Sequence, residues 1–271
     1  MSAIGKLEDN VVGLTETALM LAAIDRPGCD PEPYGRHLEK LTDDVAAYAG
    51  KDAEHPRRGL AMRAEALRQV LAKRYGYGGC DDAYEDVEYG NLIKVIDRRQ
   101  GLPELLGIIY LHVTRALGWQ IDGLNFPPRF LVRLEFAGNR VILDPFDGGI
   151  ERQPQDLRDL YKAVSGAHVE IMPNHYAAMS NRAILLRSRN NAKILSLRSD
   201  NLEGALDEIR TMLMFAPGVS ALWREAGIIN ARLDRVNEAI AALEEYLRHG
   251  GTDPGHYRTS ILLQELRSRL S

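Results

Sequence analysis

The chain has 271 residues, of which 45% are hydrophobic and 27% charged, the composition of a globular protein with room for two domains. Its net charge of −4 at pH 7 gives no general case for nucleic-acid binding, although residues 176–271 carry a small excess of basic side chains. Two cysteines, Cys29 and Cys80, are too few for a disulfide framework, which favours a reducing compartment. No apolar run approaches the roughly 20 residues of a membrane span. We therefore expect a cytoplasmic protein that does not enter the membrane.

The first part of the sequence predicts helices from apolar residues at helical spacing. They cover residues 11–24, 32–49, 57–75, 91–98 and 103–117. Pro103 suits the first position of the last of these helices, because its missing N–H would be unpaired there in any case. The glycine-rich loop 75–82 offers little to bury, so we expect it on the surface.

After residue 118 the apolar pattern alternates at every second residue, which is typical of strands. Strand-like runs occupy 119–123, 129–136 and 140–144, and the turn Ala137-Gly-Asn139 joins the last two into an antiparallel hairpin. From Pro154 the chain returns to helix. The first predicted domain, residues 1–175, is therefore α+β, with a small sheet against helices.

The second predicted domain, residues 176–271, is helical and has an internal period of 34 residues. Ala205, Ile209 and Pro217 recur as Ala239, Leu243 and Gly251. This spacing resembles the tetratricopeptide repeat, a helical hairpin in which small residues allow close approach. We expect Trp223 and Leu243 to fill the space between two helices. A plain antiparallel helix bundle is the alternative, because the first copy has Lys193 where the repeat prefers glycine.

Several motifs of the first domain indicate a family. They are Tyr75-Gly-Tyr-Gly-Gly79, Asp97-Arg-Arg-Gln-Gly-Leu-Pro103, Pro128-Arg-Phe-Leu-Val-Arg133 and Asp144-Pro-Phe-Asp-Gly-Gly149. With them the chain resembles bacterial proteins that join a transglutaminase-like domain to tetratricopeptide repeats, often described as invasion-regulator-like. The resemblance implies a papain-like core helix beside a small antiparallel sheet, preceded by N-terminal helices and followed by an all-α repeat domain.

The resemblance also implies where a catalytic site would lie. An active member needs a cysteine at the start of the core helix, a histidine on the next strand and an aspartate on the strand after it. Here the core-helix positions hold Pro103 and Leu105, the histidine position holds Arg129, and Asp144 alone is kept. We therefore expect a degenerate site without catalysis, cofactor or metal. Asp144 either pairs with Arg129 or caps the turn Pro145-Phe-Asp-Gly.

Two further clusters carry charge. The acidic segment 80–88 includes Asp81, Asp82 and Glu85 but lacks the order of a calcium loop, so it is either solvated or a docking patch for a basic partner. The segment 180–199 is basic, with Arg182, Arg189 and Lys193 near one helical face. That face is either solvated or a site for an anionic partner. Cys80 lacks a histidine in any shared motif, which argues against a nucleophile.

These patterns favour a non-catalytic interaction or regulatory protein that binds a protein partner through its repeat groove. A thiol hydrolase or transferase is the first alternative, supported by the fold alone. A nucleic-acid-associated regulator is the second, although the basic excess is small and no aromatic stacking pattern accompanies it.

Overall fold

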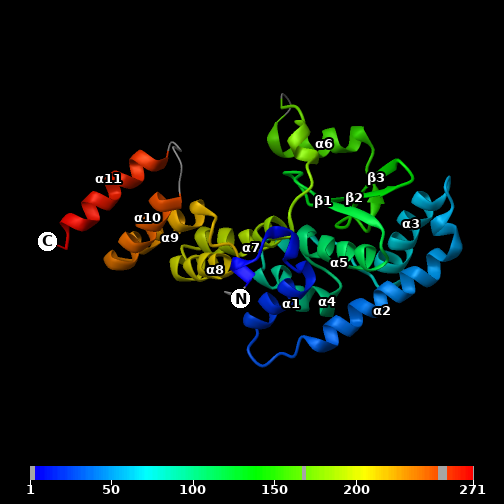
Figure 1. The fold of residues 1–271 in the computed structure, drawn as a ribbon, viewed down its shortest axis with the longest axis horizontal. Helices are drawn as coiled ribbons and strands as arrows, with labels where there is room; N and C mark the ends of the chain where they lie inside the picture. Colours follow the sequence, from blue (N-terminus) through cyan, green and yellow to red (C-terminus); the bar gives the residue numbers. More distant parts are fainter. Residues whose placement is uncertain (1–3, 167–168, 250–254, 271) are drawn as a thin grey trace. The chain divides into compact units, whose positions relative to one another are not determined.

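The computed structural model describes residues 4–166, 169–249 and 255–270, and for Asn10 and Asp81 it describes the backbone alone. The chain forms two compact units, one of residues 13–188 and one of residues 189–271 together with 1–12 (Figure 1). This division differs from the predicted boundary after residue 175. The start of α7 (Asn181–Arg198) is held by the first unit, because Arg115 bonds to Asn181 and Ile184 packs near Gly123.

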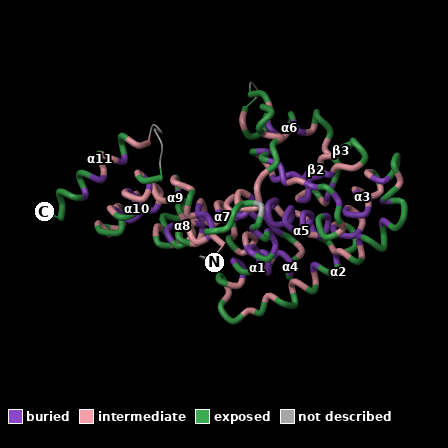
Figure 2. Tube along the Cα trace, in the orientation of Figure 1, coloured by how far each residue is buried: buried purple, intermediate pink, exposed green. Residues whose placement is uncertain are grey.

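Five α-helices precede the sheet in the first unit. They are α1 (Leu14–Ile24), α2 (Glu32–Ala49), α3 (Gly59–Leu67), α4 (Leu92–Arg98) and α5 (Pro103–Ala116), and α3 continues as a π-helix at Arg68–Arg74. The central helix is α5, which contacts α1, α2 and α4 on one side and the sheet on the other. Figure 2 shows it buried along most of its length. The predicted helices are therefore present, with bounds that shift by a few residues.

The sheet has four antiparallel strands in the order β1-β2-β3-β4. Its strands are β1 (Gln120–Leu124), β2 (Leu131–Phe136), β3 (Asn139–Asp144) and β4 (Ile150–Glu151). The predicted hairpin is confirmed, with Arg133 opposite Ile142. The two-residue strand β4 was not predicted, and it places Ile150 opposite Asp144.

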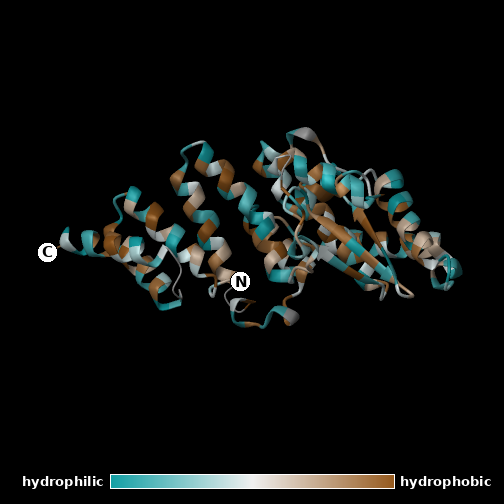
Figure 3. Ribbon diagram, turned by 90° about the horizontal axis from the view of Figure 1, so that it is seen from above, coloured by the Kyte–Doolittle hydropathy of each residue, from teal (hydrophilic) through white to brown (hydrophobic). Residues whose placement is uncertain are grey.

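Helices cover both faces of this sheet (Figures 1 and 3). On one face the Phe130 ring lies between α5 and β1, where a Cβ added to Gly107 or Gly123 would approach it to 2.2 or 2.4 Å. On the other face α6 (Pro154–Ser165) packs Leu157 and Tyr161 against β1 and β2. Because only glycine admits the ring so closely, these two glycines fix how near α5 comes to the sheet. The predicted α+β class is confirmed.

The loop 75–82 is not the surface loop that its glycines suggested. Tyr77 is fully buried, the Gly78 N–H donates to the Arg99 carbonyl, and the Gly79 N–H donates to the Phe146 carbonyl at 2.7 Å. The expectation was wrong because it counted apolar side chains and ignored the backbone. These glycines let the main chain itself pack beside the end of β3.

The second unit is helical. It contains the end of α7 and the helices α8 (Leu202–Phe215), α9 (Ser220–Arg232), α10 (Val236–His249) and α11 (Gly255–Ser268). From α8 to α11 consecutive helices pack against each other, and a short 3₁₀ turn at Ile4–Lys6 lies against α8. Gly227 of α9 meets Leu243 of α10 so closely that a Cβ there would lie 2.4 Å from the leucine. This is the close approach of small residues expected of a tetratricopeptide hairpin.

Leu243, rather than Trp223, fills the centre of that hairpin. Leu243 is fully buried with Ala239, Leu263 and Leu266, whereas Trp223 is half-buried and donates its indole N–H to the Pro217 carbonyl at 2.8 Å. We expect Leu243→Ala to lower the free energy of unfolding by about 2–5 kcal/mol and Trp223→Ala by less. Urea denaturation of both variants measures the difference. A larger loss for Trp223→Ala would place the tryptophan back in the core.

Candidate functional site

The start of α5 holds the positions where the motifs would put a nucleophile. Leu102 precedes the helix in extended conformation, and Pro103 and Leu105 are both buried. Neither side chain has a group that can attack a carbonyl. The residue between them, Glu104, is an acid that is only 5% exposed.

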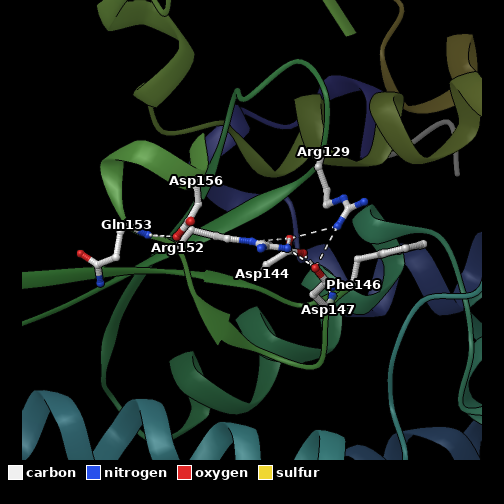
Figure 4. A network of polar contacts seen from close by, with 7 residues as sticks. All are labelled: Arg129, Asp144, Phe146, Asp147, Arg152, Gln153 and Asp156. Carbon is white, nitrogen blue, oxygen red and sulfur yellow. Dashed lines mark hydrogen bonds and ion pairs between the residues drawn. The ribbon is translucent and has the colours of Figure 1, made fainter. Parts of the chain in front are cut away.

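Arg129 and Asp144 lie together, as their positions predicted. The Arg129 guanidinium donates to Asp144 Oδ2 at 3.2 Å and stacks over the Phe146 ring at 4.6 Å (Figure 4). Asp144 also accepts the backbone N–H groups of Phe146 and Asp147. Both roles considered for Asp144 are therefore present, because one oxygen pairs with arginine while the other caps the turn.

A second arginine, Arg152, completes this cluster. It donates to Asp144 Oδ2 through Nε at 3.0 Å and Nη2 at 2.7 Å, and it contacts Asp147 as well. Desolvation opposes its charge, but the bonds to Asp144 outweigh it, and the pKa of Arg152 is raised above its ordinary value. Arg152 was not predicted from the sequence. In the structure, strand alternation at β4 puts residues 150 and 152 on one face beside Asp144.

Both carboxylate oxygens of Asp144 are therefore already occupied by hydrogen-bond donors. Asp144 is fully buried, yet it holds two guanidinium groups and two backbone N–H groups within 3.3 Å. A carboxylate surrounded only by donors accepts hydrogen bonds and has no histidine to orient. Arg129 carries no basic nitrogen, since guanidinium stays protonated in proteins.

A second buried ion pair lies at the start of α5. Arg187 of α7 donates to Glu104 Oε1 at 2.7 Å and to the Phe126 carbonyl at 2.8 Å. Glu104 Oε2 is buried without a hydrogen bond to any described residue. The pair fastens the first turn of α5 to the loop between β1 and β2. Arg187 lies in the basic segment 180–199, and its contact with Glu104 was not predicted from the sequence.

Tyr84 lies between the two clusters. The residue is 40% exposed overall, while burial of its phenol, together with the nearby Glu104 carboxylate, raises its pKa to about 12. Arg129 and Arg187 act on it in the opposite sense. The phenol therefore stays protonated at neutral pH and can donate one hydrogen bond.

Cys80 is half-buried next to this region, one residue after Gly79. Interaction with the Cys80 thiol raises the pKa of the Tyr89 hydroxyl. Among the histidines that the structure describes, none bonds to Cys80. The geometry therefore supplies no base for this thiol.

The structure does not show the exposed basic face that the sequence predicted on α7. Arg189 is buried and paired with Glu208 of α8 at 2.7 Å, and Lys193 is buried and paired with Glu225 of α9 at 2.5 Å. These two cations hold the second unit together and present no surface to an anionic partner. Arg182 is half-exposed. The prediction failed because both acids lie far along the chain, 19 and 32 residues away.

The acidic segment is exposed. Asp82 and Glu85 face solvent and form no ion pair with a described residue, whereas Glu88 binds Lys94 at 2.5 Å. The side chain of Asp81 lies outside the described residues. A docking role for Asp82 and Glu85 stays a prediction.

Neither a metal site nor a membrane-spanning helix occurs among the described residues. Within residues 4–166, 169–249 and 255–270, no group of three or more His, Cys, Asp or Glu side chains is placed to hold a metal ion. No helix in this part of the chain combines the length and apolarity that crossing a bilayer requires.

A half-buried histidine of α2, His37, should make stability depend on pH. His37 Nε2 lies 2.7 Å from Arg99 Nη1 and 2.9 Å from the Tyr77 hydroxyl. Arginine only donates, so Nε2 must accept and stay unprotonated. Desolvation first, and then the Arg99 charge, lower the pKa of His37 below its ordinary 6.5.

The sign of the effect follows from the lowered pKa. Below about pH 6.5 the unfolded chain binds a proton at His37 that the folded chain does not bind. The contribution of His37 to the free energy of unfolding is therefore fully present above about pH 6.5 and decreases as the pH falls below that value. We expect His37→Gln to lose less stability than wild type between pH 7 and pH 5 in urea titrations, with exposed His249→Gln as the control. Equal slopes for all three proteins would contradict this assignment.

Comparison with known proteins identifies both parts of the chain. The model of the transglutaminase-like superfamily matches residues 32–190, and that of the tetratricopeptide repeat matches residues 192–264. No solved structure gives a significant match.

Curated relatives match most of this chain. A UPF0162 protein of Xylella fastidiosa is 26% identical over 245 residues, which cover 89% of this chain and 85% of that protein. A UPF0162 protein of Vibrio cholerae is 30% identical over 193 residues, 71% of each chain. One of Pseudomonas aeruginosa is 29% identical over 216 residues, 79% of this chain and 77% of that protein. The resemblance first seen in the motifs is thus confirmed, and the chain belongs to the transglutaminase-like superfamily, as one of the bacterial UPF0162 proteins in which this domain precedes a tetratricopeptide repeat.

Proposed function

We propose that this protein works by binding a protein partner and does not catalyse a reaction. The observation that carries the proposal is the state of Asp144. Of the three positions that an active site would need, it alone keeps its residue type, and both of its oxygens are already used by Arg129, Arg152 and the turn. Such a cluster favours a rigid scaffold.

The repeat unit supports the second half of the proposal. Tetratricopeptide repeats bury their small residues between helices and leave helix faces open to a peptide or helix. The exposed Asp82 and Glu85 offer a further surface for a basic partner. On this proposal the protein acts in the cytoplasm and needs neither cofactor nor nucleic acid.

The decisive experiment measures thiol-dependent activity in the full-length chain. Ester hydrolysis and the transfer of a fluorescent amine to a glutamine donor are followed for wild type, Cys80→Ser and Cys29→Ser. We expect all three to match the buffer blank before and after iodoacetamide. Activity that iodoacetamide abolishes and that Cys80→Ser alone removes would establish the thiol enzyme instead.

A further inference from the structure

A separate cavity lies in the first unit, on the α6 side of the sheet. It holds about 470 Å³, within the range of small-molecule sites. Its walls come from β2, β3, the segment after β4, the first turns of α6 and the turn at Pro173–Tyr176. The lining residues are Arg133, Arg140, Val141, Ile142, Glu151, Arg152, Gln153, Pro154, Leu157, Pro173 and Tyr176.

The floor of this cavity is apolar. Ile142 of β3 is half-buried, and Leu157 of α6 is only 2% exposed. Pro154 and Pro173 add apolar surface and have no N–H to satisfy. An apolar body that covers this floor removes hydrocarbon from water.

The walls are cationic, and one cation is unbalanced. Arg133 is neutralised by Asp122 at 2.6 Å and Glu135 at 2.6 Å, and Arg152 by Asp144. Arg140 is exposed and forms no ion pair with any residue that the structure describes. It stands on the same face of the sheet as Ile142, two residues along β3.

The acid among the lining residues, Glu151, is hydrogen-bonded within the wall. Its carboxylate accepts a hydrogen bond from Gln153 Nε2 at 2.9 Å and forms no ion pair with Arg140 among the described residues. Glu151 lies opposite Leu143 in the ladder and also borders a second hollow with Ala61 and Ala64 of α3.

One further group favours an anion. The first turn of α6 borders the cavity, but its positive end is already capped, because the Gln153 N–H donates to the Asp156 carboxylate at 2.7 Å (Figure 4). The hydroxyl of Tyr176 has no hydrogen bond to a described residue, and burial raises its pKa, so it remains a donor at neutral pH.

We infer that this cavity binds a small organic acid, with its carboxylate against Arg140 and its apolar body over Ile142 and Leu157. A neutral analogue would lose the ion pair with Arg140, and an amine would be repelled by Arg140. This site is independent of the proposed protein partner, because it uses neither the repeat unit nor the acidic segment.

The test titrates the full chain with 2-naphthoate, 2-naphthalenemethanol and 2-naphthylmethylamine, followed by calorimetry and by ligand-observed NMR. We expect saturable binding of the naphthoate and at least about tenfold weaker binding of the other two, the factor that about 1.4 kcal/mol provides. Arg140→Met should weaken naphthoate binding by a similar factor. Ile142→Phe should weaken it by filling the floor, with thermal melting to verify that this variant folds. Arg57→Met, another exposed arginine of the same unit, should bind as wild type does.

Three outcomes would overturn the inference. They are an absence of saturable naphthoate binding, an affinity for the amine equal to that for the acid, and an unchanged affinity in Arg140→Met. Loss of binding in Arg57→Met to the same degree would assign the effect to the net charge of the protein.

Discussion

Asp144→Asn should lower the free energy of unfolding by about 3–5 kcal/mol, among the largest losses that a single polar substitution can cause here. The substitution keeps the size of the side chain but removes the charge that two arginines share. Arg129 and Arg152 would remain close together, 22% and 13% exposed, with no carboxylate between them except that of exposed Asp147. Urea denaturation at neutral pH measures the loss.

The two arginines should contribute unequally. Arg152 makes two hydrogen bonds to Asp144 and Arg129 makes one, so Arg152→Met should cost more than Arg129→Met, whose loss we expect at about 1–2 kcal/mol. A double-mutant cycle of Arg129→Met with Asp144→Asn should give a coupling of about 0.5–3 kcal/mol. Coupling near zero would mean that Arg129 serves another purpose, such as contact with a bound partner.

Arg187→Met should also cost about 3–5 kcal/mol, because it leaves the Glu104 carboxylate buried and unpaired. Glu104 is 5% exposed, and its Oε1 depends on Arg187. The Phe126 carbonyl would lose its donor as well. The same denaturation experiment measures this loss.

Partial rescue separates the charge effect from lost packing. Glu104→Gln removes the stranded charge, so the double variant with Arg187→Met should regain part of the stability lost in Arg187→Met alone. Arg198→Met, on the same helix and exposed, is the matched control and should change stability by about 0.5 kcal/mol or less. A double variant as unstable as the sum of its parts would show that packing, and not charge, dominates.

Helices and strands whose ends or apolar periodicity are visible in the local sequence were predictable. Helix α2 begins and ends as predicted, because Pro31 and Pro33 mark its start and Gly50 its end. The hairpin of β2 and β3 follows from its alternation and turn. The pairing of Arg129 with Asp144 was one of two readings, and the family motifs pointed to the right neighbourhood.

The contacts that decide the site join residues that lie far apart in the sequence, and no local sequence pattern links them. Arg187 reaches Glu104 across 83 positions, and Lys193 reaches Glu225 across 32. A basic residue on a helix looks the same in the sequence whether it faces solvent or a distant buried acid. Strand β4 has two residues, too few to show alternation in the sequence. Because the strand was not predicted, Arg152 beside it was not predicted either.

The placement of residues 4–12 affects how the protein is made. This segment belongs to the same compact unit as residues 189–271, and its turn at Ile4–Lys6 rests on α8, which begins at residue 202. A ribosome makes this segment well before α8, so its binding surface appears only after residues 13–188 have been made. A nascent chain that stalls before α8 would therefore leave this segment exposed.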